Sequence, residues 1–408
     1  MKRIVAIDIL RGFALMGILV MNIMSFAMPD TAYYNPAAFG GDEWFNQLTY
    51  AVVHVMADQK FMALFSLLFG ASVMLIINNL ESKGEKTARF HYVRNFWLLI
   101  FGIVHATYIW AGDILMIYAA CSFVLYFMRK LAPKWQFTLG LIIFLLPALG
   151  YIIGYEVVGE MPASDIATLE SYWAPSDAEL NAEIDYYLGN ETDSAIAWGE
   201  AAGPAIDVYD VTALIEFFTR AFGMMLMGMA LFSWGVITAQ FSDQFYRRMV
   251  LTGFGIGVPI AALGVWFNSA NNWAALESVF IGRIPNLIAT PFVAAGYIGL
   301  VMLWSRSEIW AGLQQRLAAA GRMALTNYIA QSIIGTFIFY GFGLGMYGSL
   351  NRLMLLPVVV IIWAIQLWYS PLWLRYFRYG PLEWLWRSLS HWKIQPIRRH
   401  EFVGSAQT

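Results

Sequence analysis

The stretch that decides the fold comes first: "MKRIVAIDILRGFALMGILVMNIM" (residues 1–24), basic at its start and apolar through most of its length. It begins like a secretory signal peptide. Its apolar run is too long for one, however, and it carries Asp8 and Arg11 and lacks a small-residue cleavage site. We interpret it as a retained first transmembrane helix.

The rest of the chain has the same character. Of its 408 residues, 59% are hydrophobic and only 13% are charged. A soluble protein so poor in charge could not cover its surface, whereas a chain surrounded by lipid turns apolar side chains outward as well as inward. The sequence therefore predicts an all-α, polytopic membrane bundle that forms a single membrane domain over residues 1–408. Nothing in it points to nucleic acid binding.

Apolar windows of about 20 residues, long enough to cross a bilayer, can be placed ten times. They cover 8–28, 60–80, 92–110, 113–130, 135–155, 213–239, 249–268, 284–304, 322–342 and 353–373. Basic residues cluster beside alternate ends of these windows, so the positive-inside rule makes that side cytoplasmic. We therefore expect both termini to be cytoplasmic.

One long segment, residues 156–212, is expected on the outer side. No Lys or Arg occurs between Lys134 and Arg220, while acidic residues accumulate there. Its aromatic residues, Trp173 among them, favour a small folded cap, although a solvated loop with no further role stays open. The tail, residues 374–408, mixes Trp, Tyr and Arg as membrane-interface segments do, and we interpret it as a cytoplasmic interfacial anchor.

Ionisable groups inside membrane spans are costly, so those that remain mark candidate functional positions. In the first span, Arg11 and Asn22 fall on one helical face and Asp8 lies one turn before Arg11. This arrangement fits a polar line that leads inward from the cytoplasm. An interfacial Asp–Arg pair that fixes the helix register explains the same residues.

Further along, His54 and Asp58 are four residues apart and Lys60 is close by, toward the outer leaflet. Arg94 is expected near the cytoplasmic side of the third span. Arg322 offers another guanidinium in "GRMALTNYIAQS" (321–332). These positions join Asp8, Arg11 and Asn22 as expected substrate-binding residues.

The segment "HATYIWAGDIL" (105–115) places a histidine and an aspartate in an apolar run. The hairpin at 110–113 is too short to separate two helices, so His105 lies about two turns from it and Asp113 begins the next helix. An adjacent carboxylate would orient the imidazole for general-base work. A helix-capping Asp113 with an unrelated buried His105 explains the sequence equally well. We expect the pair to meet in a polar cavity of the outer half, with His54 and Asp58 on its opposite wall.

Sequence motifs of several enzyme classes are absent from the chain. The chain has no P-loop, no HExxH, no GxSxG and no dinucleotide fingerprint. Its single cysteine, Cys121, excludes an internal disulfide and a cysteine-based zinc site. We expect no metal site and no permanently bound cofactor.

Five blocks of the sequence together resemble the bacterial YeiB-type membrane family, a domain of unknown function. They are "IDILRGFALMGILVMNI" (7–23), "KFMALFSLLFGAS" (60–72), "GIVHATYIWAGDILMIYA" (102–119), "GRMALTNYIAQSIIGTFIFYGFGLG" (321–345) and "SPLWLRYFRYGPLEWLWRSL" (370–389). The resemblance implies a multi-pass protein of the bacterial inner membrane.

That family is grouped with transmembrane acyltransferases such as heparan glucosaminide N-acetyltransferase. Those enzymes share an opening D-x-x-R-G helix, seen here at Asp8 to Gly12, and move an acyl group from cytoplasmic acyl-CoA to an acceptor. In the heparan enzymes a histidine precedes an aspartate similar to Asp58 by about ten residues. Here that position is near Leu48, so His105, which matches the YeiB pattern, is the candidate base.

Three functions follow as hypotheses. The first is an acyltransferase that uses acyl-CoA or a lipid-borne donor as co-substrate, with Arg11 and Arg94 attracting donor phosphates and His105 and Asp113 as catalytic residues. The second is a transporter or lipid-handling protein with the same polar path. The third is a haem or metal protein that uses His54 and His105. Membrane lipids and a small-molecule or lipid substrate are the expected partners, and a homodimer is left open.

Overall fold

The computed structural model describes residues 4–41, 43–201 and 208–399, and this part of the chain is helical, without a β-sheet. Its long helices are α1 (Val5–Ala27), α4 (Lys60–Glu81), α5 (Thr87–Tyr108), α7 (Pro133–Gly159), α11 (Val208–Ser233), α12 (Asp243–Ala270), α14 (Ile284–Trp304) and α17 (Arg352–Tyr376). Shorter helices of the bundle are α3 (Trp44–Met56), α6 (Leu115–Leu125) with the 3-10 turn η1 (Tyr126–Lys130), α15 (Ala311–Arg322) and α16 (Ala324–Phe339). The remaining elements lie at its ends: α2 (Thr31–Tyr34), α8 (Ala163–Trp173), α9 (Asp177–Leu188), α10 (Asp193–Ala201), α13 (Ala275–Val279), η2 (Ile281–Arg283) and α18 (Pro381–Ser390).

The predicted helical membrane bundle is confirmed. Seven segments of the described chain are long and apolar enough to cross a membrane: Val5–Ala27, Trp44–Glu81, Pro133–Gly159, Thr212–Ser233, Asp243–Ala270, Ala275–Trp304 and Arg352–Tyr376. The other three expected windows also contain helices. Of these, α6 has 11 residues and α16 has 16, while α5 has 22 residues but is more polar, because several of its side chains face a cavity.

The bundle is organised around α1. Most of its residues are buried, and it packs against α4, α14, α15, α16 and α17. It approaches α15 closely at Gly12 and Gly321: a Cβ on Gly12 would lie 2.0 Å from the Leu317 carbonyl oxygen, and one on Gly321 would lie 2.1 Å from that of Asp8. By contrast α7, α12 and α17 turn most of their apolar residues outward, as lipid-facing helices do.

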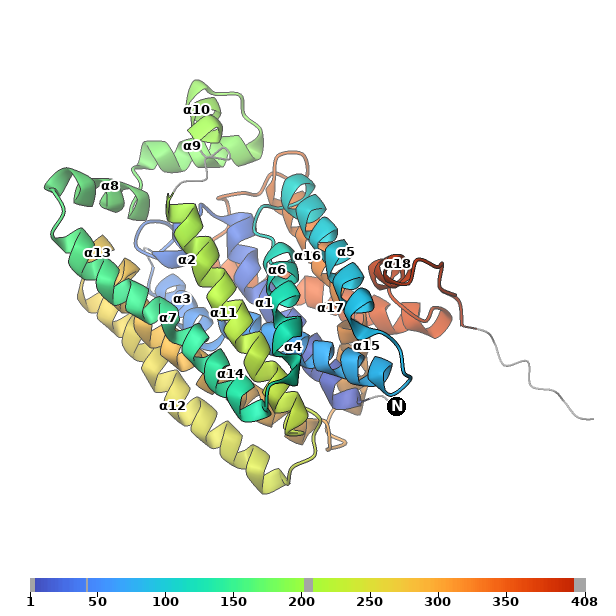
Figure 1. Cartoon of the computed structure of the whole chain (residues 1–408). Coiled ribbons are helices and arrows are strands. Elements are labelled where there is room, and N and C mark those ends of the chain that lie inside the picture. Colours follow the sequence, from blue (N-terminus) through green and yellow to red (C-terminus); the bar gives the residue numbers. More distant parts are fainter. Residues whose placement is uncertain (1–3, 42, 202–207, 400–408) are drawn as a thin grey trace, which may run out of the picture.

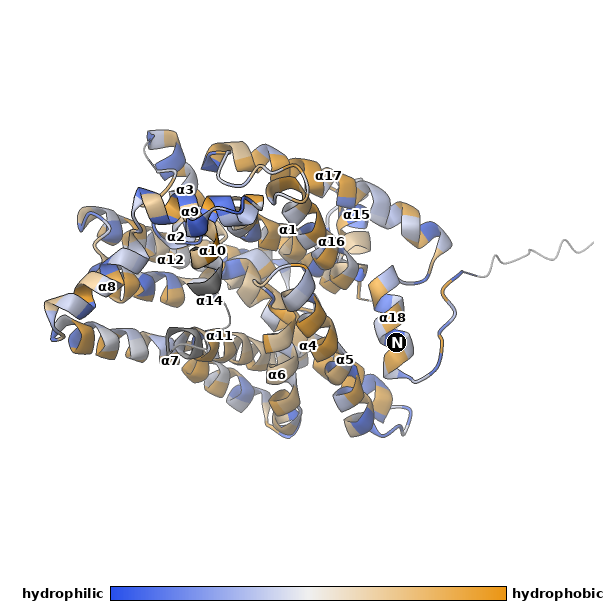
Figure 2. Cartoon of the chain, turned by 90° about the horizontal axis from the view of Figure 1, so that it is seen from above, coloured by the Kyte–Doolittle hydropathy of each residue, from blue (hydrophilic) through white to orange (hydrophobic). Residues whose placement is uncertain are grey.

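The two ends of the bundle differ. Figure 1 places α8, α9 and α10 at one end and the start of α1 at the other. Figure 2, seen from the α8–α10 end, shows hydrophobic colouring along α1, α4 and α17 and hydrophilic colouring on α9. Helices α8 to α10, which carry acidic residues, and the start of α1 thus lie at opposite ends of the bundle, the arrangement expected if these ends face opposite sides of a membrane.

Helices α8, α9 and α10 form a cap that is held to the bundle by specific contacts. Thr31 donates a hydrogen bond to the Trp173 carbonyl at 2.8 Å, and the Gly341 amide donates to the Tyr187 carbonyl at 2.9 Å. In α9 the buried Glu183 carboxylate accepts 2.9 Å hydrogen bonds from the Asp30 amide and the Tyr347 hydroxyl. Burial, with Asp30 nearby, raises the pKa of Glu183 to about 7.

Candidate functional site

A cavity of about 420 Å³ opens among α1, α4, α5, α6, α15, α16 and the C-terminal segment with α18. Its interior is mostly apolar, with walls that include Phe65, Leu68, Val73, Leu98 and Leu325. Its polar part contains five arginines and two carboxylates: Arg11, Arg94, Arg322, Arg378, Arg387, Asp8 and Glu383. We call it the arginine cavity. Its form suits a molecule with an anionic head and an apolar tail.

Arg11 is positioned by two neighbours. Its guanidinium lies 3.5 Å from the Asp8 carboxylate, one helical turn away, and donates a 2.9 Å hydrogen bond to the Ser72 hydroxyl on α4. Both side chains of the Asp8–Arg11 pair line the arginine cavity. The Asp8–Arg11 pair expected from the sequence therefore fixes Arg11 in the cavity wall, whereas Asn22, the inner member of the expected polar line, does not line this cavity.

Arg94 is held by the C-terminal segment. Its guanidinium lies 3.7 Å from the centre of the Trp386 ring, and the Trp386 indole donates a 2.7 Å hydrogen bond to the Arg94 carbonyl. Arg322 donates to the carbonyl of Arg378 at 3.3 Å. The segment interpreted from sequence as an anchor thus also supplies cavity wall: Arg378, Tyr379, Glu383, Trp386 and Arg387.

Glu383 is the second carboxylate of the cavity wall. It accepts hydrogen bonds from the Thr326 amide at 3.0 Å and the Thr326 hydroxyl at 2.6 Å, which tie α18 to α16. Burial raises the pKa of Glu383, because the charged form loses its hydration. The described wall carries an excess of positive charge because five arginines face two carboxylates.

His105 and Asp113 meet. His105 Nδ1 lies 2.8 Å from Asp113 Oδ1, and each side chain is 1% exposed. The other carboxylate oxygen of Asp113 accepts the Met116 amide at 2.8 Å, so one aspartate both caps α6 and orients the imidazole. The capping contact and the contact with His105 are therefore made by the same side chain, so His105 is not unrelated to Asp113.

The pair does not line the arginine cavity directly. Tyr328 is in the cavity wall, and its ring centre lies 5.2 Å from that of His105, which places the imidazole behind Tyr328. His105 Nε2 is buried and has no hydrogen-bond partner among the described residues. Such an atom takes its hydrogen bond from water, from a ligand or from a reacting group, or it is left strained.

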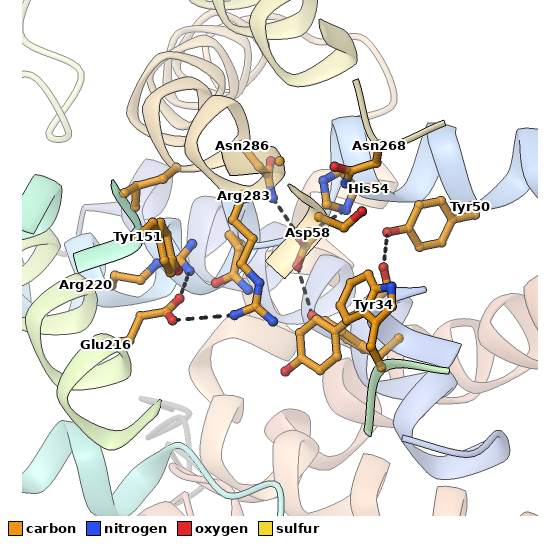
Figure 3. A pocket seen from close by; sticks show the side chains of 16 residues that line it. Tyr34, Tyr50, His54, Asp58, Tyr151, Glu216, Arg220, Asn268, Arg283 and Asn286 are labelled. Atoms are coloured by element: carbon orange, nitrogen blue, oxygen red, sulfur yellow. Dashed lines mark hydrogen bonds and ion pairs between the residues drawn. The ribbon is translucent and has the colours of Figure 1, made fainter. Parts of the chain in front are cut away.

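His54 and Asp58 lie in a different place from the one expected. They do not face His105 across one cavity but line a separate pocket of about 50 Å³ beneath the cap (Figure 3). His54 Nδ1 is 3.3 Å from Asp58 Oδ2, and Asp58 also accepts hydrogen bonds from Tyr33 at 2.9 Å and Asn286 at 2.7 Å. The cause is the break between α3 and α4, which turns both residues toward α2 and α14 rather than toward α5.

Two other expected binding residues do not line either pocket. Lys60 is fully buried and donates to the His54 carbonyl at 2.9 Å and to the Asn286 side chain. Asn22 is half-buried on α1 and is absent from the lining of both pockets. Lys60 is thus a support of the pocket beneath the cap, and a binding role for Asn22 stays a prediction.

The sequence reasoning missed residues that are distant along the chain. Arg378 and Arg387 belong to the C-terminal tail, which we interpreted from its tryptophans as a membrane anchor. Glu216, Arg283 and Asn286 reach the pocket beneath the cap from α11, η2 and α14. In the sequence, such positions stand out only because charged residues are rare inside apolar windows. That rarity does not indicate which of these residues contact one another.

The fold and the arginine cavity define a multi-pass helical membrane protein with a polar site inside the bundle. The chain belongs to the YeiB-type family. It is 32% identical to "Uncharacterized protein YeiB" of Escherichia coli (strain K12) over 399 residues, which cover 96% of this chain and 97% of that protein. It is 30% identical to "Uncharacterized protein YxaH" of Bacillus subtilis (strain 168), over 98% of this chain and 96% of that protein.

Residues 231–393 match the family described as "Protein of unknown function (DUF418)". A further relative, "Uncharacterized 39.9 kDa protein in amylase 3'region" of Bacillus acidopullulyticus, is 24% identical over 97% of this chain and 96% of its own length. The DUF418 match contains α12 to α18, including Arg322, Arg378 and Arg387. Arg11, Arg94 and the His105–Asp113 pair precede it.

Proposed function

We propose that this protein is an acyltransferase of the bacterial inner membrane whose acyl donor occupies the arginine cavity. One observation carries the proposal: among the described residues, five arginines and only two carboxylates line the polar part of a cavity that is otherwise mostly apolar. Guanidinium groups bind phosphate oxygens in pairs of parallel hydrogen bonds, and apolar walls accept a hydrocarbon chain. The donor class is therefore a phosphate-bearing acyl carrier, acyl-CoA or an acyl lipid.

In the proposed reaction, His105 is the general base. Oriented by Asp113, its Nε2 accepts the proton of an acceptor hydroxyl or amine while that oxygen or nitrogen forms a bond to the acyl carbonyl carbon. The bond from that carbon to the donor sulfur or oxygen then breaks, and the leaving group takes the proton back from His105. Because Tyr328 lies between His105 and the cavity, its ring must swing aside in this step.

A transporter or lipid-handling role would use the same cavity without bond breaking. Binding and transfer must therefore be measured separately. The protein, purified in nanodiscs, is titrated with acyl-CoA by calorimetry, with free coenzyme A and phosphatidylglycerol as competitors, and the loss of acyl-CoA is followed in the presence of membrane extract.

The variant pair Arg94→Ala and Arg387→Ala is expected to weaken acyl-CoA binding at least tenfold each, since each removes a charge-assisted contact to phosphate. The matched control is Arg248→Ala, an exposed arginine on α12 outside the cavity, which should bind as the wild type does. Unchanged binding in both cavity variants would refute the donor site. Tight binding without consumption of the donor would favour the lipid-handling role.

A further inference from the structure

The pocket beneath the cap is a second built site, and it shares no lining residue with the arginine cavity. Its walls come from α2, α3, α7, α8, α11, α12, α13, η2 and α14, together with the bend between α3 and α4 (Figure 3). Trp173 of the cap is part of the wall. The pocket is therefore formed only where the cap meets the bundle.

Four polar atoms of the wall are buried and have no hydrogen-bond partner within the described chain: Gln59 Oε1, Asn268 Oδ1, Ser278 Oγ and Arg220 Nε. Buried polar atoms are nearly always paired with protein groups, water or a ligand, so four such atoms on residues of one small pocket indicate that polar molecules occupy it. Gln59 Oε1 and Asn268 Oδ1 can only accept a hydrogen bond, Arg220 Nε can only donate one, and Ser278 Oγ can do either. A ligand hydroxyl, which both donates and accepts, satisfies this mixture, whereas an anion can only accept.

The charges that face the pocket balance. Glu216 is 2.7 Å from Arg220 and 3.8 Å from Arg283. Figure 3 draws both ion pairs. Asp58 accepts hydrogen bonds from Tyr33 and Asn286 and lies 3.3 Å from His54 Nδ1. The ammonium group of Lys60 is directed to His54 and Asn286 behind the wall. Two arginines and two carboxylates in the described part of the wall leave it without net charge, which favours a neutral ligand over an ion.

The pocket is also small and partly aromatic. A volume of about 50 Å³ holds about four water-sized groups. Tyr34, Tyr50 and Trp173 add flat apolar faces against which carbon-bound hydrogens can pack. The occupant is thus the polar end of a molecule rather than a large molecule.

We propose that this pocket binds the hydroxyl-bearing end of a neutral polyol, such as glycerol or the diol edge of a sugar, which reaches it from the cap side. The same chemistry is presented by a free solute and by the glycerol headgroup of a phospholipid. The site goes beyond the proposed acyl transfer, and binding there does not require that transfer.

Saturation-transfer NMR on the protein purified without glycerol tests the ligand class. Glycerol and methyl α-glucoside should both receive saturation, and acetate should receive less than a tenth as much. An acetate signal equal to that of the polyols, or no polyol signal, would overturn the proposal. Competition by phosphatidylglycerol but not phosphatidylethanolamine in the nanodisc would assign the site to the lipid headgroup, and no competition by either would assign it to a free solute.

Variants locate the site. Ser278→Ala and Asn268→Leu should each weaken glycerol binding about tenfold, while Ser269→Ala, at the exposed neighbour on α12, should not change it. Arg387→Ala should lose acyl-CoA binding and keep the polyol signal, so failure of one proposal does not imply failure of the other. Wild-type polyol binding in both pocket variants would place the ligand elsewhere. If a variant does not fold, the selectivity of the wild type for polyols over acetate still tests whether the protein binds a neutral polyol.

Discussion

At the scale of single residues, the described part of the chain contains two histidine–aspartate pairs in different surroundings. His105 and Asp113 are enclosed behind Tyr328, and His54 and Asp58 line a small pocket. Only His105 has a buried ring nitrogen without a partner among the described residues. This difference separates the proposed base from a histidine that belongs to a binding pocket.

His105→Gln is therefore expected to lower acyl transfer about 100-fold or more, because a glutamine amide cannot take up the proton. Donor binding should persist, since His105 does not line the arginine cavity. Acyl-CoA consumption and calorimetric binding measure the two quantities. His54→Gln is the matched comparison. Loss of transfer in His54→Gln with full transfer in His105→Gln would assign the base role to the other pair.

A second residue-scale prediction concerns Glu183. Its pKa of about 7 lies above that of an unfolded glutamate, so the folded state binds its proton more tightly. Stability from this group is fully present below about pH 4.5 and is lost as the pH rises through 7. Asp30, whose pKa burial also raises, acts in the same direction.

Thermal unfolding of the purified protein between pH 5 and 8 is the measurement. The wild type should lose about 2–3 kcal/mol across this range through Glu183. Glu183→Gln keeps an oxygen for the Asp30 amide and should flatten the dependence and be the more stable variant at pH 8. An identical slope in both proteins would show that Glu183 is ionised in the folded state throughout.

At the scale of elements, the contact between α5 and α6 positions the His105–Asp113 pair. A Cβ on Gly102 would lie 2.6 Å from the Met116 amide nitrogen and 2.9 Å from the Asp113 carboxylate. Only a residue without a side chain lets α6 begin so close to α5. The short hairpin and this glycine together place the carboxylate beside the imidazole.

Gly102→Ala should thus push the start of α6 away and loosen the pair while the rest of the bundle stays assembled. The expected result is an acyl-transfer loss similar to that of His105→Gln, together with a lower unfolding temperature. Gly150→Ala on α7 is the control, because a Cβ there meets nothing within 4 Å. Equal transfer rates in the two alanine variants would contradict this view of the α5–α6 contact.

Local contacts were predictable from sequence and long-range ones were not. The His105–Asp113 contact follows from a hairpin of a few residues, and the Asp8–Arg11 contact from one helical turn. His54 and Asp58 were correctly paired by their spacing but assigned to the wrong cavity, because the bend between α3 and α4 sets the direction of both side chains. The bend includes Gln59 with a positive φ of 64°, a conformation that periodicity does not reveal.

At the scale of the whole molecule, the cap lies at one end of the bundle and the start of α1 at the other (Figure 1). Orientation in the membrane follows from the charge pattern of the sequence: the end at which α1 begins should be cytoplasmic. A cysteine placed at Asp177 in α9 should react with an impermeant thiol reagent added to intact cells, and one placed at Arg247 in α12 should not. Cys121 is buried and gives little background. The reverse labelling pattern would invert the topology.

The arginine cavity also has a consequence for biosynthesis. Its wall combines Arg11, from the first helix to leave the ribosome, with Arg387, from α18 near the end of the described chain. The early helices must therefore enter the membrane before the segment that completes their site exists. Likewise, Arg94 is synthesised well before Trp386, the residue on which its guanidinium stacks. A chain that stops before α18 would keep its membrane helices and lack a finished cavity, so the cavity is completed only after α18 has been synthesised.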